Sequence, residues 1–132
     1  MLELRYGRRW QIAGGTLMVL TLAAAILPQL PFWRSVPGTG FEHADKIMHF
    51  LTFFILTVYF CGQYPRSAYW RIALGLLAFG ALIEILQSFV GYRLAEGADL
   101  LADAVGVAAG LAAAVAGIGG WSLHAERWLA AR

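Results

Sequence analysis

Charged residues are scarce in this sequence, and their scarcity limits what the protein can be. Asp, Glu, Lys and Arg make up 14% of the 132 residues, whereas they make up about 25% of an ordinary soluble domain. Hydrophobic residues account for 60%, above the usual share of about 45–50%. This composition excludes disorder and a nucleic-acid-binding tail, and it disfavours a soluble globular fold. No nucleic-acid partner is therefore expected, despite the net charge of +2.

Cysteine and the common catalytic signatures are also nearly absent. The single cysteine, Cys61, lies in an apolar run, so we expect a small buried hydrophobe and no disulfide within the chain. The sequence has no His-Glu-x-x-His motif, no paired cysteines, no glycine-rich phosphate loop and no serine nucleophile elbow. We therefore expect no cofactor and no zinc site.

Long uncharged runs are what the sequence has instead. Four apolar segments of about 18–22 residues are each long enough to cross roughly 30 Å of hydrocarbon as a helix. They lie at 10–30, 47–64, 72–90 and 100–121. Strand alternation is absent, and lipid offers no partner for unpaired backbone groups, so these segments are expected to be helical. The sequence predicts an all-α bundle of four transmembrane helices in a single domain over 1–132.

Basic residues favour one orientation of these helices. Most lie at the two ends of the chain or between the second and third segments: Arg5, Arg8, Arg9, Arg66, Arg71, Arg127 and Arg132. The opposite side carries only Arg34, Lys46 and Arg93. The positive-inside rule therefore predicts that both termini are cytoplasmic. The first run is longer than the apolar core of a typical signal peptide, about 7–15 residues, which disfavours cleavage. The tail at 122–132 is amphipathic and is expected to lie along the cytoplasmic interface.

Several polar residues interrupt the apolar segments near their expected outer ends. They are Asp45, His49, Glu84, Gln87, Asp99 and Asp103. Within each segment they are three or four residues apart, so each set shares one helix face. An ionisable group in hydrocarbon costs at least about 2.5–3.5 kcal/mol, so such groups indicate a functional site. The helical rise puts all three sets within one or two turns of the same interface. We expect them to converge on one outward-facing polar cavity.

Small residues recur every four positions in the last apolar segment, at Ala102, Gly106, Gly110 and Ala114. Such a ridge lets another helix backbone approach closely. It indicates either close packing within the chain or a homo-oligomer that associates through Gly106 and Gly110.

Four short elements resemble the VanZ-like family of small bacterial membrane proteins. The string D-K-I-M-H-F at 45–50 is similar to the family's D-K-x-x-H-F, and E-I-L-Q-S-F at 84–89 to its E-x-x-Q-x-F. The segment 91–93 resembles its G-R turn with one inserted residue. The segment 99–106 resembles its D-x-x-x-N-x-x-G, with Asp103 where the family often has Asn. The likeness covers roughly 41–117.

The resemblance implies a multi-pass protein of the bacterial cytoplasmic (inner) membrane. The family takes its name from a protein associated with resistance to teicoplanin, a glycopeptide antibiotic. Many members occur outside any resistance setting, so the resemblance supports membership of the family more strongly than it supports a role in antibiotic resistance.

Two classes of function remain open. In the first, the cavity binds or shields envelope components such as membrane lipids or a lipid-linked glycan. In the second, a small membrane enzyme uses His49 and Glu84 as a proton-transfer pair. In both, the remaining polar residues hold the substrate: Asp45, Lys46, Gln87, Arg93, Asp99 and Asp103. Among these, Lys46 and Arg93 suit an anionic phosphate. A transporter is a third option, although four spans are few.

Structural explanations exist for the same residues. Asp45 is suited to stabilise a helix N-terminus, and Glu84 to form a buried ion pair. The oxygens of Asp99 and Asp103, with His49 and Glu84, would suit Mg²⁺ or Ca²⁺. No ligand spacing supports such an ion, however, so no metal is expected.

Overall fold

The computed structural model describes residues 1–27, 44–90 and 97–131, and every regular element among them is helical. Five α-helices follow one another: α1 (Gly7–Ile26), α2 (Ala44–Cys61), α3 (Tyr69–Phe89), α4 (Gly97–Ala113) and α5 (Trp121–Ala130). A short 3₁₀ turn, η3 (Arg66–Ala68), precedes α3, and a π-helical turn, η4 (Ala114–Ile118), extends α4. The predicted all-α class is confirmed.

Three helical stretches of the described chain are long and apolar enough to cross a membrane. They are Gly7–Ile26, Arg66–Phe89 and Gly97–Ile118. The fourth expected span corresponds to α2, which is not among them. That helix opens on the charged pair Asp45 and Lys46, and the chain just before Ala44 lies outside the described residues. The structure therefore identifies three candidate spans, one fewer than the sequence predicts.

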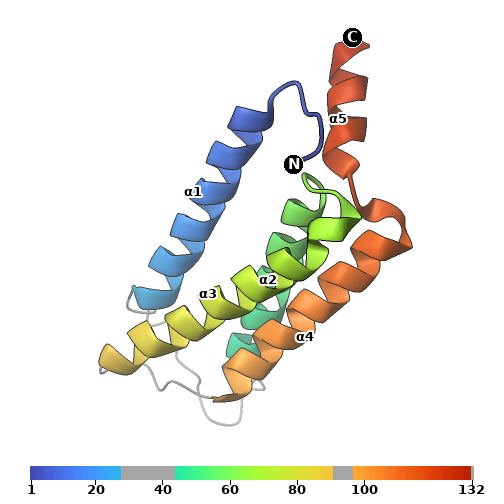
Figure 1. The fold of residues 1–132 in the computed structure, drawn as a ribbon. Helices are drawn as coiled ribbons and strands as arrows, with labels where there is room; N and C mark the ends of the chain where they lie inside the picture. The colour runs from blue at the N-terminus through green and yellow to red at the C-terminus, as the bar shows by residue number, and fades with distance from the viewer. Residues whose placement is uncertain (28–43, 91–96, 132) are drawn as a thin grey trace.

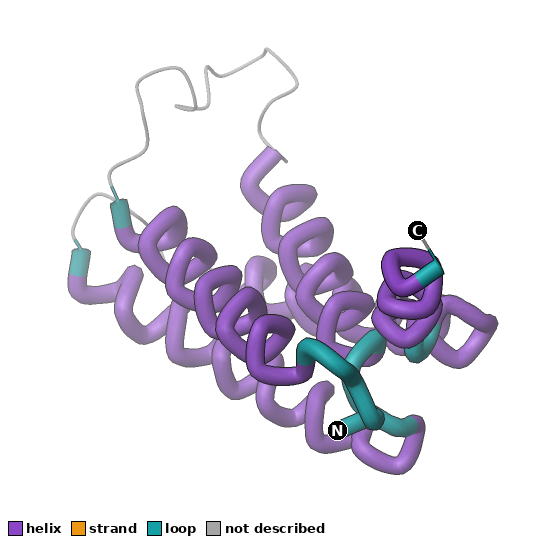
Figure 2. The backbone as a smooth tube through the Cα atoms, turned by 90° about the horizontal axis from the view of Figure 1, so that it is seen from above, coloured by secondary structure: helices purple, strands orange, loops and turns teal. Residues whose placement is uncertain are grey.

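The helices α2, α3 and α4 form the centre of the fold, and α1 lies beside α3 (Figure 1). The view from above shows the same arrangement, with the long helices side by side (Figure 2). Contacts between α2 and α4 follow the same direction along both helices: Gly106 lies against Phe50, and Gly110, one turn later, lies against Thr57. These two helices therefore run parallel, and their first turns lie at the same end of the bundle.

Two glycines make this parallel contact close. A Cβ atom added to Gly106 would collide with the backbone of Phe50, and one added to Gly110 would lie 2.6 Å from the Cβ of Thr57. The predicted small-residue ridge thus packs against α2 within the chain, which is the first of the two uses expected for it. Association of two copies through the same glycines stays a prediction.

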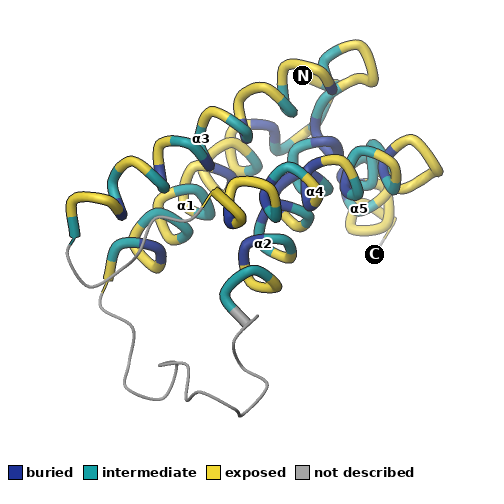
Figure 3. The backbone as a smooth tube through the Cα atoms, turned by 90° about the horizontal axis from the view of Figure 1, so that it is seen from below, coloured by how far each residue is buried: buried dark blue, intermediate teal, exposed yellow. Residues whose placement is uncertain are grey.

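Large apolar side chains point outward along the helices as well as inward. The core contains Phe53, Leu56, Leu76, Ile83 and Val107. Exposed positions nevertheless carry many more: Val19, Leu20, Ile55, Leu74, Ile85, Phe89 and Leu101. Figure 3 shows exposed stretches along the long helices outside the buried centre. An extended apolar exterior of this kind suits contact with hydrocarbon rather than water.

The last two helices meet at a glycine break that composition did not reveal. The expected fourth segment runs to Trp121, but the helix ends at Ile118 and a new helix begins at Trp121. Gly117 and Gly120 have φ angles of 143° and 72°, values that residues other than glycine rarely adopt. The first helix likewise ends at Ile26, and residues 28–30 of the expected first segment lie outside the described residues.

A buried glutamate fastens α5 to the start of α1. Glu126 accepts hydrogen bonds from the backbone amides of Arg5 (2.7 Å) and Tyr6 (3.0 Å) and from the Trp10 indole (2.8 Å). Arg5 and Tyr6 lie directly before α1, so their backbone amides have no hydrogen-bond partner within that helix. Burial alone would raise the pKa of Glu126, but these hydrogen bonds together lower it below its ordinary value. The N-terminal segment and α5 thus lie together at one end of the bundle, called here the terminal end.

Gly106→Ala should destabilise the protein by about 1–3 kcal/mol, because the added methyl group meets backbone atoms of α2 that cannot rotate away. Unfolding of the detergent-solubilised protein measures the effect. Gly75→Ala is the matched control on α3, since a Cβ there meets nothing within 4 Å, and it should be neutral or stabilising by about 0.5–1 kcal/mol. Equal effects of the two substitutions would refute the packing described here.

Glu126→Gln should lower the melting temperature at neutral pH, because a neutral amide cannot accept all three hydrogen bonds as a carboxylate does. A lowered pKa in the folded state stabilises the fold above the unfolded pKa, and that stability is lost as the pH falls through the folded value. The gap between wild type and variant should therefore close below about pH 4. Thermal unfolding across pH measures it, with the exposed Glu3→Gln as control. A gap that is independent of pH would contradict this account.

Candidate functional site

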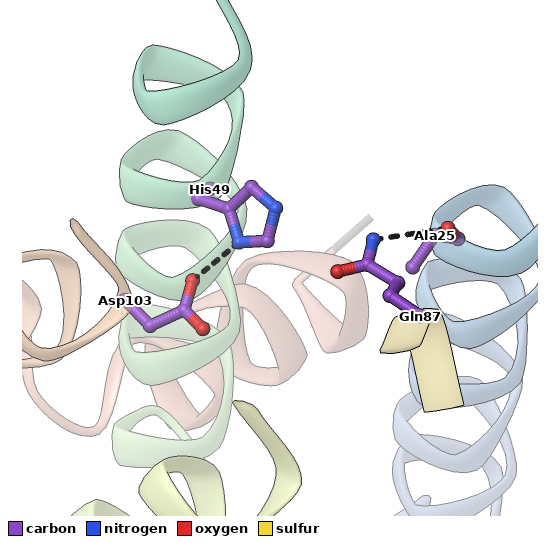
Figure 4. Close-up of polar contacts among 4 residues, drawn as sticks. All are labelled: Ala25, His49, Gln87 and Asp103. Atoms are coloured by element: carbon purple, nitrogen blue, oxygen red, sulfur yellow. Dashed lines mark hydrogen bonds and ion pairs between the residues drawn. The ribbon is translucent and has the colours of Figure 1, made fainter. Parts of the chain in front are cut away.

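His49 and Asp103 meet across the contact between α2 and α4. The His49 Nδ1 lies 2.9 Å from the Asp103 Oδ1 (Figure 4). The Asp103 side chain is 0% exposed and the His49 side chain 9%. An ionised carboxylate can only accept a hydrogen bond, so the imidazole carries a proton on Nδ1 and donates it. The carboxylate thereby fixes the orientation of the ring and leaves its Nε2 for another partner.

Two more carboxylates lie beside this pair. Asp45 comes from the first turn of α2 and Asp99 from the first turn of α4. One oxygen of each and one ring nitrogen of His49 all lie within 4.8 Å of one another. Asp99 is 3% exposed, and it lies one helical turn before Asp103 on the same face. The end of the bundle that carries these four residues is called here the acidic end.

Gly80 on α3 leaves room for the carboxylate of Asp103. A Cβ atom at this position would lie 2.6 Å from the Asp103 Oδ2 and 3.3 Å from the Phe53 ring. Any side chain there would push the carboxylate away from His49 or push α3 away from α4. Sequence reasoning did not single out Gly80, because nothing in the sequence distinguishes it from other glycines until the helices are placed.

Glu84 lies one turn beyond Gly80 on the same helix, so α3 brings it to the acidic end. It is half-buried and within electrostatic range of His49 and of Asp45, Asp99 and Asp103. Its Oε1 and the Oδ2 of Asp103 are buried, and neither accepts a hydrogen bond from the described residues. A buried oxygen without a donor costs about 1–3 kcal/mol. These two oxygens are therefore suited to a proton, a cation or a bound ligand.

Gln87 connects α3 to α1. Its side-chain Nε2 donates a hydrogen bond of 3.1 Å to the backbone oxygen of Ala25 (Figure 4). Ala25 lies in the last turn of α1, where carbonyl groups have no partner within the helix. The amide nitrogen of Gln87, which we expected to hold a substrate, therefore holds the end of α1 in this structure.

The structure brings five of the predicted site residues to one end of the bundle: Asp45, His49, Glu84, Asp99 and Asp103. Lys46 follows Asp45 in the first turn of α2. Arg93, predicted as a phosphate ligand, lies outside the described residues. The carboxylate that hydrogen-bonds His49 is Asp103 on another helix, although Asp45 shares a face with His49 within α2. Spacing along one helix shows which residues share a face, but it does not show contacts between helices.

A model of the VanZ/LLP1 family matches residues 7–118. The chain belongs to the VanZ/LLP1 family. The matched range runs from α1 to η4, so it contains every residue of the acidic end, and α5 lies outside it. The resemblance inferred from the four short elements is therefore confirmed. No curated protein and no solved structure matches the chain.

The protonation state of the His49 ring nitrogens tests whether His49 and Asp103 form the central pair of this VanZ/LLP1 site. In ¹⁵N NMR spectra of the protein in micelles, Nδ1 of His49 should be protonated. Asp103→Asn should preserve this state, because an amide oxygen still accepts the bond, whereas Asp103→Leu should abolish it. The exposed His124 serves as an internal reference. An unprotonated Nδ1 in the wild type would rule out the His49–Asp103 hydrogen bond.

Proposed function

We propose that this VanZ/LLP1 protein is a four-span protein of the bacterial cytoplasmic membrane that binds the head group of an envelope lipid or lipid-linked glycan. The observation that carries the proposal is the polar cluster that α2, α3 and α4 build together at the acidic end. Charged groups inside a membrane protein are costly and therefore indicate function. Three helices contribute residues to this cluster, so it depends on how the helices pack and not on the sequence of one helix.

The fourth span and the orientation have separate support. The helix α2 packs along α4 and parallel to it, so it must lie at the same depth if α4 crosses the membrane. Basic residues gather toward the terminal end: Arg5, Arg8, Arg9, Arg66, Arg71 and Arg127. The positive-inside rule then makes the terminal end cytoplasmic and turns the acidic end toward the cell exterior.

The chemistry of the acidic end suits a hydroxyl-rich head group. Carboxylates accept hydrogen bonds from sugar or glycerol hydroxyls, and such charge-assisted bonds are stronger than neutral ones. In this role Asp45 and Asp99 accept from the ligand, and Lys46 attracts a phosphate. A protein that covers a lipid-linked precursor in this way would also shield it from a glycopeptide, which is the route by which antibiotic resistance would arise.

One observation favours a second candidate, a membrane enzyme. The buried Asp103 orients the His49 ring, as a general base requires, and Glu84 lies close enough to act as the second proton-transfer group. In this mechanism the Nε2 of His49 removes a proton from a lipid or glycan hydroxyl. Asp103 is then a positioning residue and does not touch the substrate.

Lipid and glycan profiles of a deletion strain, complemented in turn by each variant, test the proposal. If the protein binds a head group, His49→Asn and Glu84→Gln should restore the profile in part, because each removes one of several contacts. If it is an enzyme, both variants should leave the full deletion profile with accumulated precursor, because loss of a general base or acid costs about 10²–10⁴ in rate.

Glu3→Gln is the control, since Glu3 is exposed at the terminal end, and it should restore the wild-type profile. Teicoplanin susceptibility of the same strains reports on shielding, and the His49 and Glu84 variants should be more susceptible than the control. Full restoration of the profile by both His49→Asn and Glu84→Gln would show that the acidic end has no part in function.

A further inference from the structure

We propose that Asp45, His49 and Asp99 bind a divalent metal ion, and that Asp103 supports the histidine ligand from behind. The sequence led us to expect no metal, because no motif spacing is present. The ligands come from two helices that are more than 30 residues apart in the chain, so no local motif could show them. The proposal rests on their geometry and does not depend on which head group the protein binds. It excludes the second candidate function, because the Nε2 of His49 cannot both bind an ion and accept a proton.

The distances among the three ligand atoms suit a single ion. Nitrogen and oxygen ligands lie about 2.0–2.2 Å from a zinc-like ion, so any two of them are at most about 4.4 Å apart. The atoms of Asp45, His49 and Asp99 lie within 4.8 Å of one another. A small shift of the half-buried Asp45 side chain would bring the three atoms within reach of one ion.

The hydrogen bond from His49 to Asp103 matches the arrangement usual for a metal-binding histidine. Histidines that bind a metal almost always donate the other ring N–H to a carboxylate, a backbone carbonyl or water, which fixes the ring and strengthens the ligand. Here His49 donates Nδ1–H to Asp103, whose side chain is 0% exposed. In this tautomer the other ring nitrogen, Nε2, has the lone pair that would bind an ion. Gly80 keeps the space in which Asp103 reaches the ring.

Among the described residues of the acidic end, acidic groups outnumber basic ones, which favours a cation. Four carboxyl groups surround one imidazole, and the buried oxygens Glu84 Oε1 and Asp103 Oδ2 accept no hydrogen bond from the described residues. Lys46 contributes one positive charge from α2. A divalent ion would offset the repulsion among the carboxylates, which is severe in a low-dielectric interior. It would also let an anionic phosphate approach this end of the bundle.

The ligand atoms indicate which class of ion binds. Carboxylate oxygens alone would suit Mg²⁺ or Ca²⁺, whereas an imidazole nitrogen among them favours a first-row transition ion or zinc. A site with one imidazole and two carboxylates therefore fits Mn²⁺ or Zn²⁺ best. Open coordination positions would remain for water or for oxygens of a ligand.

Binding of Mn²⁺ to the chelator-treated, full-length protein in neutral detergent tests the proposal. Electron paramagnetic resonance measures the free Mn²⁺, and we expect one bound ion per chain. Asp99→Asn should weaken binding at least 100-fold. Asp103→Asn should weaken it by about 10-fold, because it alters the support of His49 but not a ligand. Glu3→Gln should bind as the wild type does.

Circular dichroism of each variant without metal shows whether it is folded. If Asp99→Asn does not fold, Asp45→Asn at the half-buried position replaces it, with the same expected loss. An absence of saturable binding to the wild type, or equal binding by the wild type and the ligand variant, overturns the proposal. The assay contains no lipid or glycan, so its failure would leave the head-group proposal standing, and failure of that proposal would leave this one standing.

Discussion

The close parallel contact between α2 and α4 is the interaction on which the candidate site depends. Gly106 and Gly110 remove the side chains that would keep the two helices apart. Because the helices run in the same direction, their first turns lie together, and both first turns carry acidic residues. The result is a hydrogen bond between His49 and Asp103 in a place closed to solvent. A wider or antiparallel contact would leave Asp103 buried without its donor, at a cost of several kcal/mol.

The two ends of the bundle differ in chemistry, and the difference follows from where the chain turns. The terminal end gathers arginines and fastens α5 to the start of α1 through Glu126. The acidic end gathers carboxylates and one imidazole. The uneven distribution of arginines between the two ends is the feature on which the proposed orientation rests. In the proposed orientation, with the terminal end cytoplasmic, the acidic end would lie toward the cell exterior.

Much of this could be predicted from the sequence, because membrane helices follow simple rules. Apolar run length predicted the all-α class, and the helical repeat predicted that Asp99 shares a face with Asp103 and that Glu84 shares one with Gln87. Contacts between helices could not be predicted in this way. The pairing of His49 with Asp103, the space kept by Gly80 and the bond from Gln87 to Ala25 all depend on how the helices are placed. The helix break at Gly117 was not predicted, because apolar composition does not show which glycine adopts a positive φ angle.

A double-mutant cycle between His49 and Asp103 tests the central claim most directly. His49→Ala, Asp103→Ala and the double variant are compared with the wild type by unfolding in detergent. If the two side chains form the buried pair that joins α2 to α4, the coupling energy should exceed about 1 kcal/mol. Effects that add to within about 0.3–0.5 kcal/mol would show that the two residues do not interact, and the site described here would not exist.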